Sequence, residues 1–266
     1  MDNTLDGFGW SMGLSLNDDR IYVADGLYNQ ILIFDKLENV FLETISLQER
    51  ICSGHIHGIE IMYDKIFVVK ENQNCIAIFD LDGKFLYEFG KKGDKQGEFN
   101  GVLGIKVSEN QIFVIDSGNN RIQIFDLDGE FLDEISTNVN GITDSVPYNL
   151  DIYDDRVYVV DRNNSTILIF NLDWVLIEKI EVNPDISNSS LSGIDVNDEM
   201  IFVADAGANM ITIFDLDGNR LVDFGKFGER FGEFNSPQSI VSDGDKIFVA
   251  DASNHRIQIF ILENIE

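Results

Sequence analysis

The chain has 266 residues, 44% of them hydrophobic, and its 47 acidic and 19 basic residues give a net charge of −28. A surface this acidic repels nucleic acid and anionic lipid, and it favours cationic ligands, metal ions and basic protein surfaces. No apolar run approaches the length of a membrane span, and residues 1–10 lack the basic and apolar regions of a secretory signal. We therefore expect a soluble protein, with the compartment left open because two cysteines do not make a disulfide framework.

A short strand-like segment recurs six times along the chain. The copies begin at residues 21, 66, 112, 157, 201 and 247, which are 45, 46, 45, 44 and 46 residues apart. They read IYVAD, IFVVK, IFVID, VYVVD, IFVAD and IFVAD. Repeats of this length built from short strands indicate an array of β-units. Because the copies fill the chain, we predict one domain over residues 1–266.

Each unit places this segment second in a series of strands. In chain order the predicted strands are 13–16, 21–25 and 31–35; 58–62, 66–70, 76–80 and 84–90; 104–108, 112–116, 122–126 and 130–136; 149–153, 157–161 and 167–171; 193–197, 201–205, 211–215 and 220–225; and 239–243, 247–251 and 257–261. The second and third strands are apolar at nearly every position, which is typical of strands buried on both faces. Four antiparallel strands in each of six units predict an all-β, six-bladed β-propeller.

The sequence Asp-Leu-Asp-Gly follows the third strand at 80–83, 126–129 and 215–218. Between two apolar runs it predicts a hairpin turn, with glycine at the position that needs a positive φ. No further acidic residues follow at the spacing of a calcium-binding EF-hand loop, so the turn is the preferred interpretation.

Two long segments resemble a known repeat. FGKKGDKQGEFNG (89–101) and FGKFGERFGEFNS (224–236) are each followed by a strand pair and the pattern Asp-x-x-Asn-x-Arg, at 116–121 and 251–256. In this order they resemble the NHL repeat. The resemblance implies a six-bladed propeller, and its members serve in protein binding, RNA binding and sensing, with metal-dependent lyases among their relatives. We interpret the Asp/Arg pair of these two units as a clamp that holds a loop.

The last unit ends where its outermost strand should begin. Residues 3–9 can be aligned with 219–225, so the N-terminal strand is predicted to complete the last blade beside residues 256–261. Such pairing would protect an open sheet edge. The alternative is a last blade of three strands.

Candidate ligand-binding residues lie on the first strands, which line the axis of a propeller. Glu60, Lys106, Asp151 and Asp195 occupy alternating positions facing the channel. His57 lies at the channel mouth, in register with Met12, Leu103, Tyr148, Ser192 and Gln238. We predict a ligand site from His57, Tyr148 and Gln238 together with the four charged residues, and the channel could also hold a Ca²⁺ or Zn²⁺ ion.

The second unit contains both cysteines and two of the three histidines. His55, His57 and Cys52 are candidate metal ligands, because imidazole and thiolate groups suit Zn²⁺. Their spacing matches no closed structural zinc pattern, and Cys75 opens a middle strand, away from the axis. No catalytic residues are predicted.

These observations favour a non-catalytic binding or scaffold propeller. It would recognise a protein or small ligand, preferably cationic, on the face formed by the blade-to-blade loops and the loops after the second strands. The alternative is a metal-dependent lyase or hydrolase with its site at the channel mouth, and RNA binding is disfavoured by the negative charge. We expect a monomer, because a closed propeller has few free strand edges.

Overall fold

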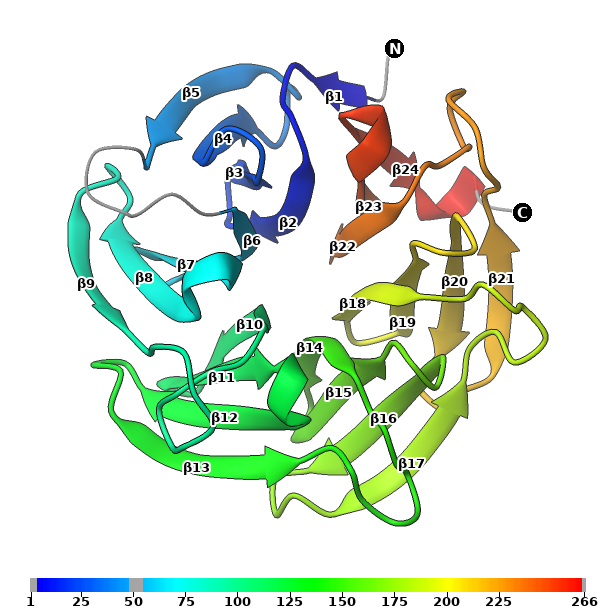
Figure 1. Cartoon of the computed structure of the whole chain (residues 1–266). Coiled ribbons are helices and arrows are strands. Elements are labelled where there is room, and N and C mark those ends of the chain that lie inside the picture. The colour runs from blue at the N-terminus through cyan, green and yellow to red at the C-terminus, as the bar shows by residue number, and fades with distance from the viewer. Residues whose placement is uncertain (1–3, 48–54, 265–266) are drawn as a thin grey trace. The chain divides into compact units, whose positions relative to one another are not determined.

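Within residues 4–47 and 55–264, which the computed structural model describes, the chain forms six antiparallel sheets of four strands each (Figure 1). Each sheet is one blade of the predicted propeller, and the predicted fold class is confirmed. The chain divides into two compact units. The first unit comprises residues 8–138, and the second comprises residues 4–7 together with 139–264.

The first unit contains blades 1 to 3. Blade 1 consists of β2 (Ser11–Leu16), β3 (Arg20–Asp25), β4 (Gln30–Asp35) and β5 (Phe41–Ser46); blade 2 of β6 (Ile56–Met62), β7 (Lys65–Lys70), β8 (Cys75–Asp80) and β9 (Phe85–Phe89); and blade 3 of β10 (Val102–Ser108), β11 (Gln111–Asp116), β12 (Arg121–Asp126) and β13 (Phe131–Ser136). Two 3-10 turns, η1 (Glu71–Gln73) and η2 (Ser117–Asn119), follow the second strands of blades 2 and 3.

The second unit contains blades 4 to 6. Blade 4 consists of β14 (Pro147–Tyr153), β15 (Arg156–Asp161), β16 (Thr166–Asn171) and β17 (Leu176–Glu181); blade 5 of β18 (Leu191–Val196), β19 (Met200–Asp205), β20 (Met210–Asp215) and β21 (Arg220–Phe224); and blade 6 of β22 (Pro237–Asp243), β23 (Lys246–Asp251), β24 (Arg256–Ile261) and β1 (Thr4–Asp6). The 3-10 turns η3 (Ala252–Asn254) and η4 (Leu262–Asn264) flank β24.

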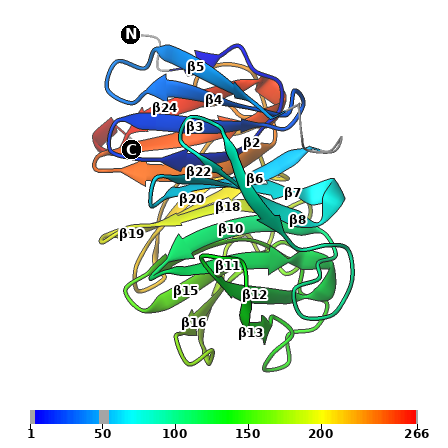
Figure 2. The ribbon, with the colours of Figure 1, turned by 90° about the vertical axis from the view of Figure 1, so that its left-hand side faces the viewer.

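The core lies between neighbouring sheets of the same unit. In the first unit, Tyr22 and Ile31 of blade 1 belong to one apolar cluster with Ile66 and Val68 of blade 2, and a second cluster joins blades 2 and 3. Figure 2 shows these sheets stacked face against face. In the second unit, blades 5 and 6 share a comparable cluster. This stacking explains why the second and third strands are apolar along their whole length: both of their faces are covered.

The Asp-Leu-Asp-Gly segments form the predicted turns. The first aspartate of each accepts two backbone N–H groups through Oδ1; for Asp80 they belong to Asp82 (3.1 Å) and Lys84 (2.8 Å). Gly83 has a φ of 78°, in the region that favours glycine. In blade 5, Asn219 donates from its side chain and its backbone to Asp215, and these bonds hold the pKa of that carboxyl below its ordinary value.

The N-terminal strand completes blade 6. β1 pairs antiparallel with β24, with Leu5 opposite Ile257 and Thr4 opposite Gln258. The predicted pairing is therefore confirmed, and the three-stranded alternative is wrong. Leu5 is only 4% exposed, so this short strand also contributes to the core. No helix in the described part of the chain is long and apolar enough to cross a membrane.

Shortening the Leu5 side chain should destabilise the protein. Leu5→Ala removes a buried side chain and should cost about 2–5 kcal/mol, which lowers the melting temperature by roughly 2–4 °C per kcal/mol in a protein of this size. Removing residues 1–6 should lower it further, because the edge of β24 is uncovered. Calorimetry checks both, with exposed Asp6→Ala as the control; an unchanged melting temperature for Leu5→Ala would contradict the role of β1.

Candidate functional site

The strand order places two sets of loops at the same end of each blade. In blades 1 to 5 the four strands are consecutive and antiparallel, so the loop between the second and third strands lies at the end where the chain leaves the blade. In blade 6 the fourth strand is β1, and the chain leaves it at the same end. We call this the loop end. In the first unit it carries η1 and η2, and in the second it carries η3.

Each first strand is interrupted by a β-bulge at its loop end. In the first unit the register shifts between Ser11 and Gly13, Ile56 and Ile59, and Val102 and Ile105. In the second unit it shifts between Pro147 and Asn149, Leu191 and Gly193, and Pro237 and Ser239. The positions predicted to share a register fall in these bulges: Met12, His57, Leu103, Tyr148, Ser192 and Gln238. A bulge changes the direction of a side chain relative to the regular pleat, so these residues need not follow strand alternation.

Close approach of neighbouring first strands accompanies the bulges. A Cβ atom on Gly13 would lie 2.7 Å from the carbonyl oxygen of His57, and one on Gly58 would lie 2.7 Å from that of Leu103. Only glycine fits at such a distance, and glycine inside a strand is the sequence signal for a bulge or a close backbone contact. The sequence prediction took these glycines as the start of a strand and so missed the bulges.

The charged residues predicted to face the channel join neighbouring blades. In the second unit, Asp151 Oδ2 accepts the backbone N–H of Val196 at 2.7 Å. One blade further, Asp195 Oδ2 accepts the backbone N–H of Ser242 at 2.9 Å and its hydroxyl at 2.5 Å. Each carboxylate therefore satisfies an edge amide on the first strand of the next blade.

The first unit repeats this arrangement with different groups. Ser15 Oγ accepts the backbone N–H of Ile61 at 3.0 Å and donates to Glu60 Oε2 at 3.2 Å. Glu60 Oε1 lies 3.5 Å from Lys106 Nζ, which belongs to the following blade. The fold thus brings Glu60 and Lys106 together in an ion pair that connects blades 2 and 3.

The candidate metal ligands of blade 2 lie in different surroundings. His55 is exposed, with Nδ1 2.6 Å from the carbonyl oxygen of Gly26, whereas His57 is buried. Cys75 is buried on β8, and Cys52 lies outside the described residues. Among the residues that the structure describes, no three His, Cys, Asp or Glu side chains converge as metal ligands.

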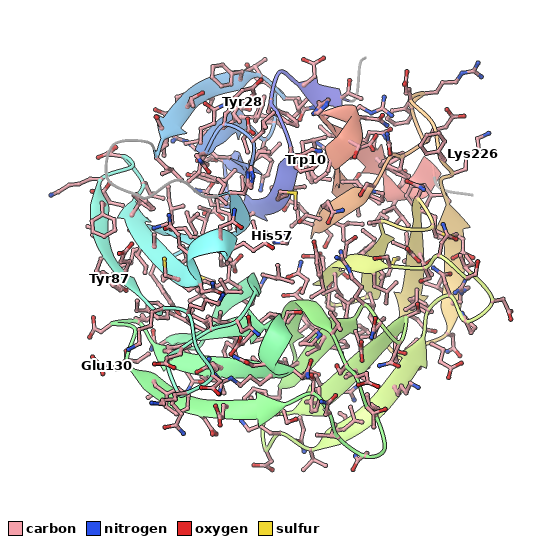
Figure 3. All side chains as sticks on the ribbon, viewed as in Figure 1. Trp10, Tyr28, His57, Tyr87, Glu130 and Lys226 are labelled. Atoms are coloured by element: carbon pink, nitrogen blue, oxygen red, sulfur yellow. The ribbon has the colours of Figure 1, made fainter. Side chains whose placement is uncertain are left out.

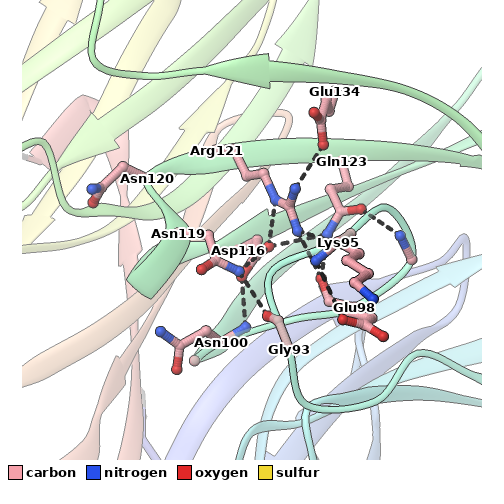
Figure 4. Close-up of polar contacts among 12 residues, drawn as sticks. Gly93, Lys95, Glu98, Asn100, Asp116, Asn119, Asn120, Arg121, Gln123 and Glu134 are labelled. Carbon is pink, nitrogen blue, oxygen red and sulfur yellow. Dashed lines mark hydrogen bonds and ion pairs between the residues drawn. The ribbon is translucent and has the colours of Figure 1, made fainter.

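The Asp/Arg pair of blade 3 agrees with the interpretation as a loop clamp (Figure 4). Asp116, at the end of β11, is fully buried. Its carboxylate accepts the backbone N–H of Asn100 (2.7 Å), Nε of Arg121 (2.7 Å) and the side-chain amides of Asn119 and Gln123. A buried carboxylate with this many donors is well compensated for the loss of water.

The clamp extends to the loop that enters the blade. The terminal nitrogens of Arg121 donate to the carbonyl oxygens of Lys95 (2.8 Å) and Glu98 (2.9 Å) and to the Glu134 carboxylate (2.7 Å). In blade 6, Asp251 and Arg256 repeat the arrangement on residues 229–235. The two units that retain the NHL-like pattern therefore hold their entry loops in the same way.

A polar cluster joins blades 4 and 6 at the loop end of the second unit. Tyr148, predicted as a site residue, donates its hydroxyl to Gln238 Oε1 at 3.0 Å, so the fold brings these two predicted residues together. The guanidinium carbon of Arg162 lies 3.2 Å from the centre of the Tyr148 ring. Arg162 was not among the predicted residues. The sequence does distinguish Arg162, because it directly follows Asp161 at a position where no other repeat has a basic residue. The equivalent residues are Gly26, Glu71, Ser117, Ala206 and Ala252.

An exposed apolar patch lies at the loop end of blade 1. Trp10, Leu27 and Tyr28 are 48%, 49% and 54% exposed, and Figure 3 labels Trp10 and Tyr28. Their segments are joined by the hydrogen bond from the backbone N–H of Gly26 to the carbonyl oxygen of Trp10 (2.8 Å). This patch was also missed, because single apolar residues in loops are common and carry no periodic signal.

Two protein-family models match the sequence, and both agree with the observed propeller fold. The NHL repeat model matches residues 234–260, and a model described as a 6-bladed beta-propeller matches residues 37–144. These matches confirm an NHL-type six-bladed β-propeller. A comparison with curated protein sequences gives no match.

Several solved structures share the propeller fold. A streptogramin B lyase is 15% identical with a TM-score of 0.69, covering 98% of this chain and 86% of that chain. Virginiamycin B lyase from Staphylococcus aureus is 15% identical with a TM-score of 0.67, covering 99% and 88%. A protein of unknown function from Bacteroides thetaiotaomicron is 15% identical with a TM-score of 0.70, covering 98% and 72%. At this identity the similarity establishes the fold alone.

Removing the charge of Asp116 should weaken the propeller. Asp116→Asn keeps the shape of the side chain but leaves the Arg121 guanidinium without its buried counter-charge, and breaking a buried pair in this way costs about 3–5 kcal/mol. Urea unfolding should show a lower midpoint. Asp133→Asn, exposed in the same blade, is the control and should unfold as the unchanged protein does; equal midpoints for both variants would contradict the clamp.

The loop held by this clamp should respond to acid. The pKa of Glu98 is lowered, first because the backbone N–H of Lys95 donates to its carboxylate and then because Lys91 lies nearby, with Nζ 3.3 Å from Oε1. A lowered folded-state pKa means that this contribution is present above the ordinary carboxyl range and is lost as pH falls through the lowered value. Carboxyl-carbon NMR titration should show a higher Glu98 midpoint in Lys91→Ala; an unchanged midpoint would exclude Lys91 as a cause.

Proposed function

We propose that this propeller is a non-catalytic binding module whose partner docks at the loop end of blade 1. The observation that carries the proposal is the exposed patch of Trp10, Leu27 and Tyr28. Tryptophan and tyrosine are the residues that most often anchor a protein interface, since each buries a large area with few rotatable bonds.

The patch is supported by a rigid framework. Asp25 is fully buried at the end of β3, and its Oδ1 accepts the backbone N–H groups of Leu27 (3.1 Å) and Tyr28 (3.2 Å). Its Oδ2 accepts the backbone N–H of Gly9 (3.0 Å), which precedes Trp10. One carboxylate therefore orders both segments that carry the patch. A surface ordered before binding loses less entropy when a partner docks.

Charge indicates the chemistry of the partner. With a net charge of −28 the protein attracts cationic molecules and repels acidic ones over a long range. We therefore infer a partner segment that is basic overall and places an apolar side chain on the patch. The charge would speed encounter, and the aromatic contacts would provide most of the affinity.

Peptide selection tests this function. Phage-displayed random peptides selected on the immobilised protein should be enriched in basic sequences with an apolar anchor. In the Trp174→Phe variant, Trp10 is the remaining one of two tryptophans, so binding of a selected synthetic peptide should change its fluorescence. Trp10→Ala or Tyr28→Ala should weaken binding of that peptide by at least about tenfold, the scale of an interface anchor.

Leu37→Ser is the matched control, because Leu37 is 83% exposed at the opposite end of the same blade. It should bind the peptide as the unchanged protein does. No enrichment of basic peptides, or binding that is indifferent to Trp10 and Tyr28, would overturn the proposal.

Metal analysis tests the non-catalytic part of the proposal. Protein purified without a histidine tag should contain no stoichiometric Zn²⁺ or Ca²⁺. A stoichiometric ion that is lost in His57→Ala would instead favour the metal-dependent lyase or hydrolase.

A further inference from the structure

The loop end of the second unit carries a guanidinium with unused donors. Arg162 Nε donates to the carbonyl oxygen of Leu191 at 3.1 Å, and the guanidinium plane covers the ring of Tyr148. Among the residues that the structure describes, Arg162 forms no ion pair, although the chain has 47 acidic residues against 19 basic ones. Its two terminal nitrogens therefore remain available to a ligand.

The surroundings hold this guanidinium in place. The backbone N–H of Arg162 donates to the carbonyl oxygen of Val146 at 3.0 Å. Below it, Tyr148 is buried in the bulge of β14, and its hydroxyl bonds to Gln238 in the bulge of β22. Gln238 in turn donates to Ser236 Oγ at 2.8 Å. The aromatic ring on which Arg162 stacks is thus fixed from blade 6, and the side chain is ordered before any ligand arrives.

We propose that Arg162 is the centre of a binding site for the carboxylate group of a small organic anion. The planar fork of a guanidinium matches a carboxylate with two parallel hydrogen bonds. A single cation neutralises a single negative charge, whereas the negative field of the protein opposes a phosphate dianion. Tyr148 and Gln238 are positioning residues, since they set the orientation of Arg162.

This site is separate from the patch on blade 1. It belongs to the other unit, and its proposed ligand is negatively charged, whereas the proposed partner of the patch is basic. Within the second unit it is confined to blade 4, because the residues equivalent to Arg162 in blades 5 and 6 are Ala206 and Ala252. Each blade of this unit therefore has a residue at this position after the second strand, and only in blade 4 is that residue a cation, Arg162.

Titration of the full chain with sodium benzoate, sodium acetate and inorganic phosphate tests the proposal, with calorimetry and ligand-observed NMR as readouts. At least one carboxylate should bind, and phosphate should bind more weakly. Arg162→Met should weaken carboxylate binding by at least about tenfold, and Arg162→Lys should weaken it less, because a charge remains without the bidentate fork. Tyr148→Phe, which removes the hydroxyl that bonds to Gln238, should give an intermediate loss.

The controls separate this site from the proposed function. Arg156→Met, at the other end of β15, should bind carboxylates as the unchanged protein does, and so should Trp10→Ala. Circular dichroism verifies folding, and Arg162→Lys decides the case if Arg162→Met does not fold. The proposal is overturned if neither carboxylate binds, if the Arg162 variants bind carboxylates as tightly as the unchanged protein, or if phosphate binds as well as the carboxylates.

Discussion

A buried carboxylate at the end of the second strand is the interaction on which the loop ends of blades 1, 3, 4, 5 and 6 depend. Five such aspartates are fully buried in the described chain: Asp25, Asp116, Asp161, Asp205 and Asp251. Each accepts a backbone N–H from the segment that enters its blade, belonging in that order to Gly9, Asn100, Val146, Ser190 and Asn235. A charge removed from water must be compensated by donors, so the carboxylate forces these backbone groups to converge on it. The loop end is consequently an ordered surface.

The same device supports different surfaces in different blades. In blade 3 it anchors an arginine that fastens the entry loop, and in blade 1 it orders the segments of the aromatic patch. In blade 4 it precedes Arg162, whose side chain turns to stack on Tyr148. Blade 2 replaces the aspartate with Lys70, which is 4% exposed and pairs with Glu88 at 3.2 Å. The side chains that differ between blades thus lie beside this structural position, where a change of side chain leaves the sheet intact.

The first strands show how a polar residue near the axis can serve the fold. An edge strand presents backbone N–H groups that need acceptors. Asp151 and Asp195 meet this need for the next blade in the second unit, and Ser15 does so in the first. The bulges free one residue in each of these strands from the regular alternation. The regular positions therefore hold neighbouring blades together, and the proposed ligand-binding groups come from the bulges and the adjoining loops.

The sequence by itself determined the blades, their turns and the strand that completes blade 6. These features depend on local patterns, because an apolar run predicts a strand buried on both faces and a glycine in a turn predicts a positive φ. It also brought Tyr148 and Gln238 into one register. Only the tertiary structure decided that they are hydrogen-bonded, that Asp151 and Asp195 are committed to the next blade, and that Arg162 covers Tyr148. The reason is physical: the hydrogen-bonded partners lie one or two repeats apart in the chain, and Arg162 follows the end of a different strand from that of Tyr148. The packing of strands and blades, which no local pattern records, selects among the donors and acceptors within reach.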